Sequence, residues 1–161
     1  MVRIFIVYGG EEGEKLGRQI ESYFKSNNIG AFLASPLSPE IAPTDDFESR
    51  IDFELKNANL AIIVVTNGIN SSQLALDEIN RILDELGYPY IPFVKDGATM
   101  PERLNGKWHV SFKNDSLSNN ELEFLELKMW RYYDQWKDKQ TQEKMEGEEI
   151  PTTKIYGLEM N

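Results

Sequence analysis

The unbroken apolar run Leu60–Val65 constrains the fold of this chain more than any other stretch. A run this short, unbroken and rich in β-branched residues is typical of a strand buried on both faces of a parallel sheet. Residues 66–70 then favour a turn, and Ser71 or Ser72 is suited to cap a following helix. Open α/β sheets bind ligands at the carboxyl ends of their strands. The stretch therefore predicts that the residues just after Val65 border a ligand site.

Glu78 lies about two turns into the expected helix, at 3.6 residues per turn. The inner face of that helix is expected to carry Ala75, Ile79, Ile82, Leu83 and Leu86. Leu74 and Glu78 are four residues apart, so we expect them to share a second face at the margin of this stripe. Asp77 is as well placed as Glu78 to pair with Arg81, which would leave Glu78 without a cation. By residue type alone an exposed helix carboxylate is the simpler interpretation of Glu78, and a site residue is the alternative.

The composition of the 161-residue chain predicts one domain and excludes several kinds of site. No cysteine is present, so disulfides, thiolate catalysis and cysteine-bound zinc are excluded. The single histidine, His109, excludes a multi-histidine metal site and is expected at the surface, so we expect no metal. The 27 acidic and 17 basic residues give a net charge of −10, which argues against nucleic-acid binding. The sequence shows no signal peptide or membrane segment, so we expect a cytoplasmic protein without membrane attachment.

The order of predicted elements is that of an α/β fold. The expected strands cover residues 3–8, 31–34, 60–65, 90–94 and 108–112, and the expected helices cover about 11–27, 44–56, 72–86 and 118–140. Gly9 and Gly10 allow a sharp turn after the first strand, and no dinucleotide fingerprint follows them. A loop with three prolines, residues 35–43, follows the second strand. We therefore predict a flavodoxin-like, five-stranded, mostly parallel sheet with helices on both faces and a long C-terminal helix. The predicted domain covers residues 1–140, and an acidic tail covers 141–161.

Four sequence segments, in their order along the chain, resemble those of a Toll/interleukin-1 receptor (TIR) domain. The resemblance is strongest to the bacterial and archaeal TIR-like proteins of antiviral defence. Phe5-Ile6-Val7-Tyr8 is similar to the F-I-S-Y opening of the family. The loop 35–43 stands where the family has a mobile loop, and Ser72 and Glu78 keep the spacing of its S-x-W-C-x-x-E motif. Residues 90–97 are similar to its fourth strand and exit. The resemblance covers about residues 3–112.

The resemblance implies cleavage of NAD⁺ at the nicotinamide–ribose bond, to ADP-ribose or a cyclic ADP-ribose signal. Glu78 matches the essential glutamate, and a lone carboxylate suits an oxocarbenium-like transition state whose leaving group needs no acid. The implied substrate-binding residues are Tyr8, Gly9 and Gly10, then Ser35 and Pro36, then Ser72 and Leu74. NAD⁺ would be a substrate, with no further cofactor. The implied partners are other copies of the chain or a separate sensor or effector in prokaryotic immunity.

The chain also departs from the family pattern. Leu74 stands where many catalytic members have tryptophan, Ala75 replaces a common cysteine, and Val7 replaces a serine. Glu11 and Glu12 stand where basic residues often occur and would not attract a pyrophosphate. These departures favour one alternative, a non-catalytic interaction module that docks through residues 35–56. Another alternative is a nucleoside deoxyribosyltransferase-like enzyme, which uses a glutamate nucleophile on a similar sheet.

Overall fold

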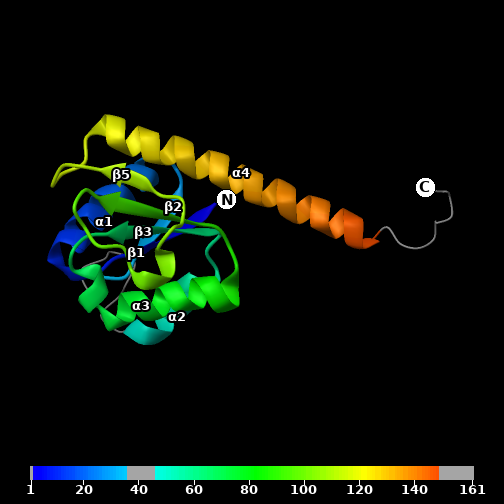
Figure 1. Cartoon of the computed structure of the whole chain (residues 1–161), viewed down its shortest axis with the longest axis horizontal. Helices are drawn as coiled ribbons and strands as arrows, with labels where there is room; N and C mark the ends of the chain where they lie inside the picture. Colours follow the sequence, from blue (N-terminus) through cyan, green and yellow to red (C-terminus); the bar gives the residue numbers. More distant parts are fainter. Residues whose placement is uncertain (1, 36–45, 149–161) are drawn as a thin grey trace. The chain divides into compact units, whose positions relative to one another are not determined.

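The computed structural model describes residues 2–35 and 46–148 of the chain. Within these ranges, parallel strands form a sheet in the order β2-β1-β3-β4-β5 (Figure 1). The strands are β1 (Arg3–Val7), β2 (Gly30–Leu33), β3 (Leu60–Val65), β4 (Tyr90–Lys95) and β5 (Val110–Phe112). The helices are α1 (Gly10–Ser26), α2 (Phe47–Lys56), α3 (Gln73–Arg81) and α4 (Asn119–Glu148), with short helical turns η1 (Ile69–Ser71), η2 (Ile82–Leu86) and η3 (Glu102–Leu104). The expected flavodoxin-like α/β fold is confirmed, and the sheet is parallel throughout.

The predicted strand over residues 60–65 is confirmed as β3, which lies between β1 and β4. All of its residues are buried, as expected for a parallel sheet covered on both faces. Ile63 pairs with Val7 of β1 on one side and with Pro92 of β4 on the other. The carboxyl ends of β1 and β3 are therefore neighbours, and the loops that follow these strands start at the same edge of the sheet.

Helices cover both faces of the sheet (Figure 1). Helix α1 packs on the face that carries Ile6 and Leu33, since a Cβ atom added at Gly17 would lie 2.7 Å from the Leu33 side chain. Helices α2 and α3 cover the opposite face (Figure 1). Their apolar side chains and those of the sheet form one buried cluster that includes Phe5, Val7, Ile63, Val65, Ile51, Leu55, Ala75 and Ile79. This cluster fixes the position of α3 relative to β1 and β3.

The strands nearest β5 differ slightly from the expectation. The expected strand over 108–112 is shorter, because only the last three residues pair with β4, and Trp108 and His109 lie outside it and are exposed. Pro92 lacks an amide hydrogen, which suggests a strand edge or a bulge. Strand β4 is the second strand from that side of the sheet, and its pairing with β5 begins only at Phe93. Pro92 is therefore placed just outside the β4–β5 ladder.

The start of each of two helices is fixed by a local cap. Asp46 caps α2 by accepting hydrogen bonds from the amides of Glu48 and Ser49 at 3.2 and 3.4 Å. The expected start of this helix, near residue 44, lies outside the described residues. Ser118 and Glu121 form a reciprocal capping box at the start of α4, with amide-to-side-chain distances of 3.0 and 3.1 Å. Helix α4 continues to Glu148, past the expected end near residue 140.

The chain divides into two compact units, residues 1–126 and residues 127–161, and the boundary falls inside α4. The first unit contains the whole sheet and helices α1 to α3. In the part of the chain that the structure describes, no helix combines the length and apolar character needed to cross a membrane.

Candidate active site

Two loops meet at the carboxyl edge of the sheet, one after β1 and one after β3. They pack so closely that Gly9 has no room for a side chain, because an added Cβ would lie 2.7 Å from the Ile69 Cα. Gly68 is equally confined, since its added Cβ would lie 2.8 Å from the Gly9 carbonyl oxygen. Gly10 has a φ angle of 80°, which favours glycine. The sharp turn expected at Gly9 and Gly10 is present, and it is packed directly against the loop after β3.

Helix α3 begins at this same edge. Ser72 is its N-cap, and the Ser72 hydroxyl accepts a hydrogen bond from the Ala75 amide at 3.2 Å. Ser71, the other serine that the sequence allows as a cap, instead ends the short turn η1. A Cβ added at Gly9 would lie 2.8 Å from the Cβ of Ser72, so the start of α3 touches the turn after β1. The structure thus brings Gly9 and Ser72 together.

Glu78 points into the protein, whereas Leu74, one turn earlier on the same side of α3, is exposed. Glu78 is 5% exposed, while Leu74 is 48% exposed. Glu78 belongs to the buried stripe with Ala75, Ile79 and Ile82, at steps of three, four and seven residues from Ala75. Leu74 is therefore in contact with solvent, and the two residues do not share an environment. The interpretation of Glu78 as an exposed helix carboxylate is excluded.

The Glu78 carboxyl group is buried, and one of its oxygens has no hydrogen-bond partner among the described residues. Its Oε2 atom accepts no hydrogen bond from any described residue. Burial is the main cause that raises the pKa of Glu78, to about 8; the charge of Arg81 opposes the rise and that of Asp77 adds to it. A buried, unpaired carboxyl group costs stability and is a feature of functional sites.

The neighbouring charges on α3 are engaged elsewhere. The Arg81 guanidinium forms ion pairs with Asp52 of α2 at 2.9 Å and with Glu85 at 3.5 Å. Arg81 does not pair with Asp77, although the spacing allows it; Asp77 accepts a hydrogen bond from the Gln73 side chain at 2.8 Å. Within the described ranges Glu78 has no bonded cation, which is the outcome considered from the sequence, but Asp52 and not Asp77 is the residue that binds Arg81.

Tyr8, directly after β1, reaches the end of β2. The Tyr8 hydroxyl donates a hydrogen bond to the carbonyl oxygen of Ala34 at 2.6 Å. Burial, and then the charges of Glu14 and Glu78, raise the pKa of Tyr8 to about 12. Tyr88 is buried, and its pKa is also raised, first by burial and then by the Glu78 charge. Both phenols therefore stay neutral and keep their hydroxyl protons at physiological pH.

Ser35, at the end of β2, is completely buried and belongs to a polar cluster with two residues of α1. Its hydroxyl donates to the Glu14 carboxylate, and the Arg18 guanidinium lies 3.2 Å from the Ser35 oxygen and 2.9 Å from Glu14. The Ser35 bond, and then the Arg18 bond, lower the pKa of Glu14. Sequence reasoning missed Glu14 and Arg18, although their spacing of four residues on one helix face indicates an ion pair.

The structure brings most of the predicted site residues to one edge of the sheet. Gly9 lies against Ser72 at the start of α3, and Tyr8 interacts with Ser35 after β2 and with the Glu14 and Glu78 charges. Leu74 is exposed on α3. Pro36 lies outside the described residues. The arrangement offers one buried acid, neutral phenols and closely packed glycine backbone, which suits binding of a polar ligand next to a single carboxyl group.

Comparison with solved structures supports the fold. The TIR domain of the Toll-related receptor TRR-2 from Hydra magnipapillata has a TM-score of 0.57 and 17% identity, over 70% of this chain and 85% of that one. The TIR domains of the activated Roq1 resistosome, which recognises the pathogen effector XopQ, have a TM-score of 0.51 and 18% identity, over 60% and 58%. A 2-deoxyribosyltransferase from Bacillus psychrosaccharolyticus has a TM-score of 0.54 and 14% identity, over 75% and 96%. These identities establish similarity of fold alone.

No match is found among the curated proteins. The family described as TIR domain matches residues 4–128, which include every strand of the sheet, helices α1 to α3 and the start of α4. That range also holds Glu78 and the two loops that meet beside it. The chain belongs to the TIR domain family.

Proposed function

We propose that this TIR domain is an NAD⁺ nucleosidase in which Glu78 is the catalytic carboxylate. The observation that carries the proposal is the buried Glu78 carboxyl group, which has no hydrogen-bond partner for Oε2 among the described residues. A structural glutamate at such a position would be expected to have a partner, because an isolated buried carboxyl group destabilises the fold. A cationic ligand would supply that partner.

The chemistry needs only one carboxylate. The bond between the nicotinamide nitrogen and ribose C1′ breaks, the bonding electrons stay with the ring, and neutral nicotinamide leaves. The ribosyl centre becomes cationic, and a carboxylate beside it stabilises the developing charge. Water then adds to C1′ and releases a proton, which gives ADP-ribose, or a nitrogen of the same molecule adds, which gives a cyclic product. No second acid is required.

The raised pKa of Glu78 fits this chemistry if substrate binding and ionisation are coupled. In the free protein the pKa of about 8 keeps most of the carboxyl group protonated at pH 7. A pyridinium ring and a developing ribosyl cation nearby would favour the ionised form. NAD⁺ binding therefore releases a proton from Glu78, and the resulting carboxylate faces the positive charge that it stabilises.

Two of the acidic residues after β1, Glu12 and Glu14, already have partners. Glu12 forms an ion pair with Lys95, and Glu14 is held by Ser35 and Arg18. The positive charge of Arg18 therefore lies next to the predicted Ser35 position. Its side chain is 41% exposed, so it is accessible to a pyrophosphate.

A non-catalytic interaction module is the second candidate. The exposed side chain of Leu74 favours it, because many catalytic family members have tryptophan at that position and leucine offers no ring for stacking.

For both candidate functions we propose a cytoplasmic protein that acts through self-association or a separate effector, in a prokaryotic antiviral response. The Roq1 resistosome supports self-association as a working mode of TIR domains.

Nicotinamide release from NAD⁺ by the concentrated full-length protein tests the proposal. We expect release by the wild type, no release by Glu78→Gln or Glu78→Ala, and full release by Glu48→Gln, a control at an exposed carboxylate of α2. Equal release by wild type and Glu78→Gln would refute the role of Glu78. No release in any condition would favour the interaction module. Base exchange on deoxynucleosides without NAD⁺ cleavage would favour the transferase alternative.

A further inference from the structure

A cavity of about 340 Å³, named here the α3 cavity, lies between helix α3 and the segment that follows β4. The loops after β3 and β4 both contribute to it, so it lies on the carboxyl side of these strands, where open α/β sheets bind ligands. Glu78 does not line the α3 cavity, so its assignment does not depend on the proposed function. The lining residues are Asn70 of η1, Leu76, Ile79 and Asn80 of α3, and Pro101, Glu102 and Arg103 at η3.

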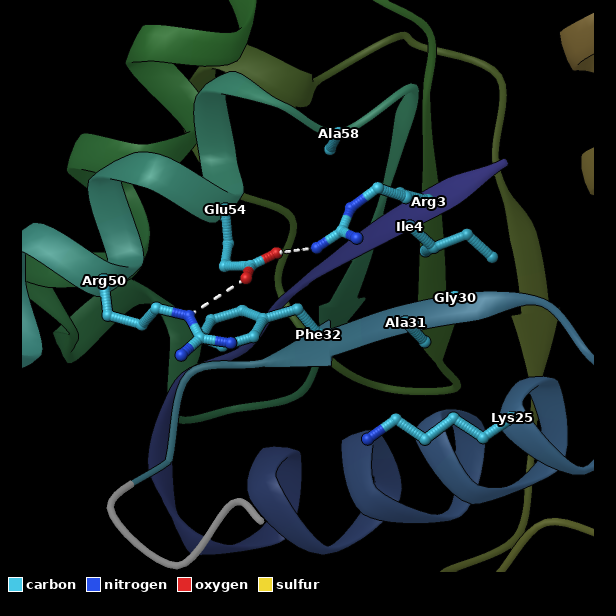
Figure 2. Close-up of a pocket in the computed structure, with 9 residues that line it drawn as sticks. All are labelled: Arg3, Ile4, Lys25, Gly30, Ala31, Phe32, Arg50, Glu54 and Ala58. Atoms are coloured by element: carbon cyan, nitrogen blue, oxygen red, sulfur yellow. Dashed lines mark hydrogen bonds and ion pairs between the residues drawn. The ribbon is translucent and has the colours of Figure 1, made fainter. Parts of the chain in front are cut away.

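Another cavity, at the amino ends of β1 and β2, has its charged side chains paired. Glu54 binds both Arg3 and Arg50 there (Figure 2). Glu21 binds Lys25 at 3.2 Å. The cations around that cavity are therefore engaged within the protein. The α3 cavity differs, because one of its charged side chains has no such partner.

The charge of the α3 cavity comes from Glu102. Asp84 binds both terminal nitrogens of Arg103, at 2.7 and 2.8 Å, so these two residues form a neutral pair. Glu102 is exposed, and its carboxylate forms no ion pair or hydrogen bond with any side chain in the described part of the chain. The lining therefore carries one unpaired negative charge, which favours a ligand with a positive charge.

Two asparagine side chains supply the other polar groups of the α3 cavity. The Asn70 Nδ2 donates a hydrogen bond to the Thr99 carbonyl oxygen at 2.8 Å, which leaves Oδ1 as an acceptor. The Asn80 Oδ1 accepts a hydrogen bond from Arg103 at 3.0 Å, which leaves the Nδ2 hydrogens as donors. The cavity thus offers two acceptors, on Glu102 and Asn70, and one donor group, on Asn80.

Apolar side chains form the rest of the lining. Ile79 is 1% exposed, Pro101 is buried and Leu76 is half-buried. An apolar surface with a few polar groups around it is usual for small-molecule sites, and about 340 Å³ is near the lower end of their volumes. The α3 cavity therefore suits a small ligand that has an apolar part.

We propose that the α3 cavity binds an α-ammonium group next to a carbonyl and an apolar side chain, as in an amino acid amide or the first residue of a peptide. The ammonium group would contact Glu102 and Asn70, and the carbonyl oxygen would accept a hydrogen bond from Asn80. The apolar side chain of the ligand would pack on Leu76 and Ile79. A free amino acid fits less well, because its carboxylate adds a negative charge close to Glu102.

Titration of the full-length protein with L-leucinamide, followed by amide NMR at pH 6.5, tests this site. At that pH the α-ammonium group is charged. We expect saturable shifts of the Asn80 side-chain amide and of the Ile79 and Glu102 backbone amides. N-acetyl-leucinamide lacks the charge, glycinamide lacks the apolar side chain, and leucine adds a carboxylate, so each should bind at least about tenfold more weakly. The absence of saturable shifts with leucinamide would overturn the proposal, as would equally tight binding of N-acetyl-leucinamide.

Glu102→Gln removes only a charge, at an exposed residue, and should weaken leucinamide binding about tenfold, corresponding to about 1.4 kcal/mol. Glu48→Gln is the same change at an exposed carboxylate of α2 outside the cavity and should bind leucinamide like the wild type. Equal affinities of Glu102→Gln and the wild type would overturn the proposal. A tripeptide amide that begins with leucine separates the two sources of this ligand: saturable binding would assign the site to peptide amino termini, and its absence to small amides.

Discussion

Glu78 and Arg81 lie three residues apart on α3, yet the Arg81 guanidinium binds Asp52 of α2 at 2.9 Å, and the buried Glu78 forms no ion pair with any residue that the structure describes. The ion pair connects α3 to α2 at the protein surface, where Asp52 is 43% exposed. Arg81 thus contributes only a long-range charge to Glu78, too weak to offset the effect of burial on its pKa. Helix α3 therefore carries a buried carboxyl group that destabilises the folded protein, at the edge of the sheet where ligands of this fold bind.

Glu78→Gln is expected to stabilise the protein at alkaline pH. The folded-state pKa of Glu78 is raised from its usual value to about 8, so the folded protein binds more protons than the unfolded chain between pH 4.5 and 8. Across that range, stability attributable to Glu78 falls as pH rises, by at most about 1.4 kcal/mol per pH unit. Glutamine does not ionise and avoids this loss.

Urea denaturation at pH 5 and pH 8.5 measures this difference. Wild type and Glu78→Gln should differ little in free energy of unfolding at pH 5, where the Glu78 carboxyl group is still neutral in the folded protein, and the variant should be clearly more stable at pH 8.5. Glu48→Gln, at an exposed carboxylate, should show no such pH dependence relative to the wild type. A stability difference that is the same at both pH values would contradict burial as the cause.

Removal of the Arg81 charge should raise the pKa of Glu78 above about 8. Arg81 is the one cation that lowers this pKa, so Arg81→Met removes the opposing effect. Asp52→Asn breaks the same ion pair but keeps the Arg81 charge, and should not raise the pKa. Carbon-13 NMR titration of the glutamate carboxyl groups follows Glu78 directly. Equal pKa values in the two variants would show that the ion pair, and not the charge, controls Glu78.

If the proposed NAD⁺ cleavage is correct, kcat/KM should rise with pH. This parameter reports the free enzyme, in which the Glu78 carboxyl group loses its proton with a pKa of about 8. The reaction requires the carboxylate, so activity should increase tenfold per pH unit below 8 and level off above it. The profile of Arg81→Met should shift to higher pH. A rate that is constant from pH 6 to 9 would be inconsistent with this role of Glu78.

The fold followed from the sequence because strong local signals agreed with one another. The strand Leu60–Val65 was predicted with its observed ends, since a short continuous apolar run bounded by turn residues in an α/β chain usually forms a buried strand. The cap at Ser72 was one of two allowed positions, and packing against Gly9 distinguishes Ser72 from Ser71. Such a contact joins segments more than sixty residues apart, and no local pattern contains it.

The burial of Glu78 was harder to predict, because it too depends on contacts between segments that are distant in the sequence. Its spacing from Ala75 and Ile79 is compatible with the buried stripe, but residue type favoured the surface. Burial depends on how α3 lies against α2 and the sheet, and the exposed position of Leu74 depends on the same placement. The polar cluster of Ser35, Glu14 and Arg18 likewise forms only when the end of β2 meets α1.

Gly9→Ala should destabilise the protein and open the site. The added Cβ would lie 2.7 Å from the Ile69 Cα and 2.9 Å from the Gly68 carbonyl oxygen, and both are backbone atoms that cannot rotate away. We expect a loss of about 1–3 kcal/mol in the free energy of unfolding. Gly30→Ala is the matched control, since its Cβ has ordinary contacts of 3.4 Å or more. Equal unfolding midpoints of the two variants would disprove the tight contact.

Leu74→Trp tests whether the departure from the family motif limits activity. Leu74 is 48% exposed on α3, so a larger ring fits there without overpacking the core. If this position forms the wall of an NAD⁺ site, a stacked ring worth about 0.5–1.5 kcal/mol should lower KM about two- to tenfold and leave kcat unchanged. Gln73→Trp adds the same ring at the neighbouring exposed position and should leave KM unchanged. Steady-state nicotinamide release separates the two variants. The same KM for both would mean that residue 74 does not touch the substrate.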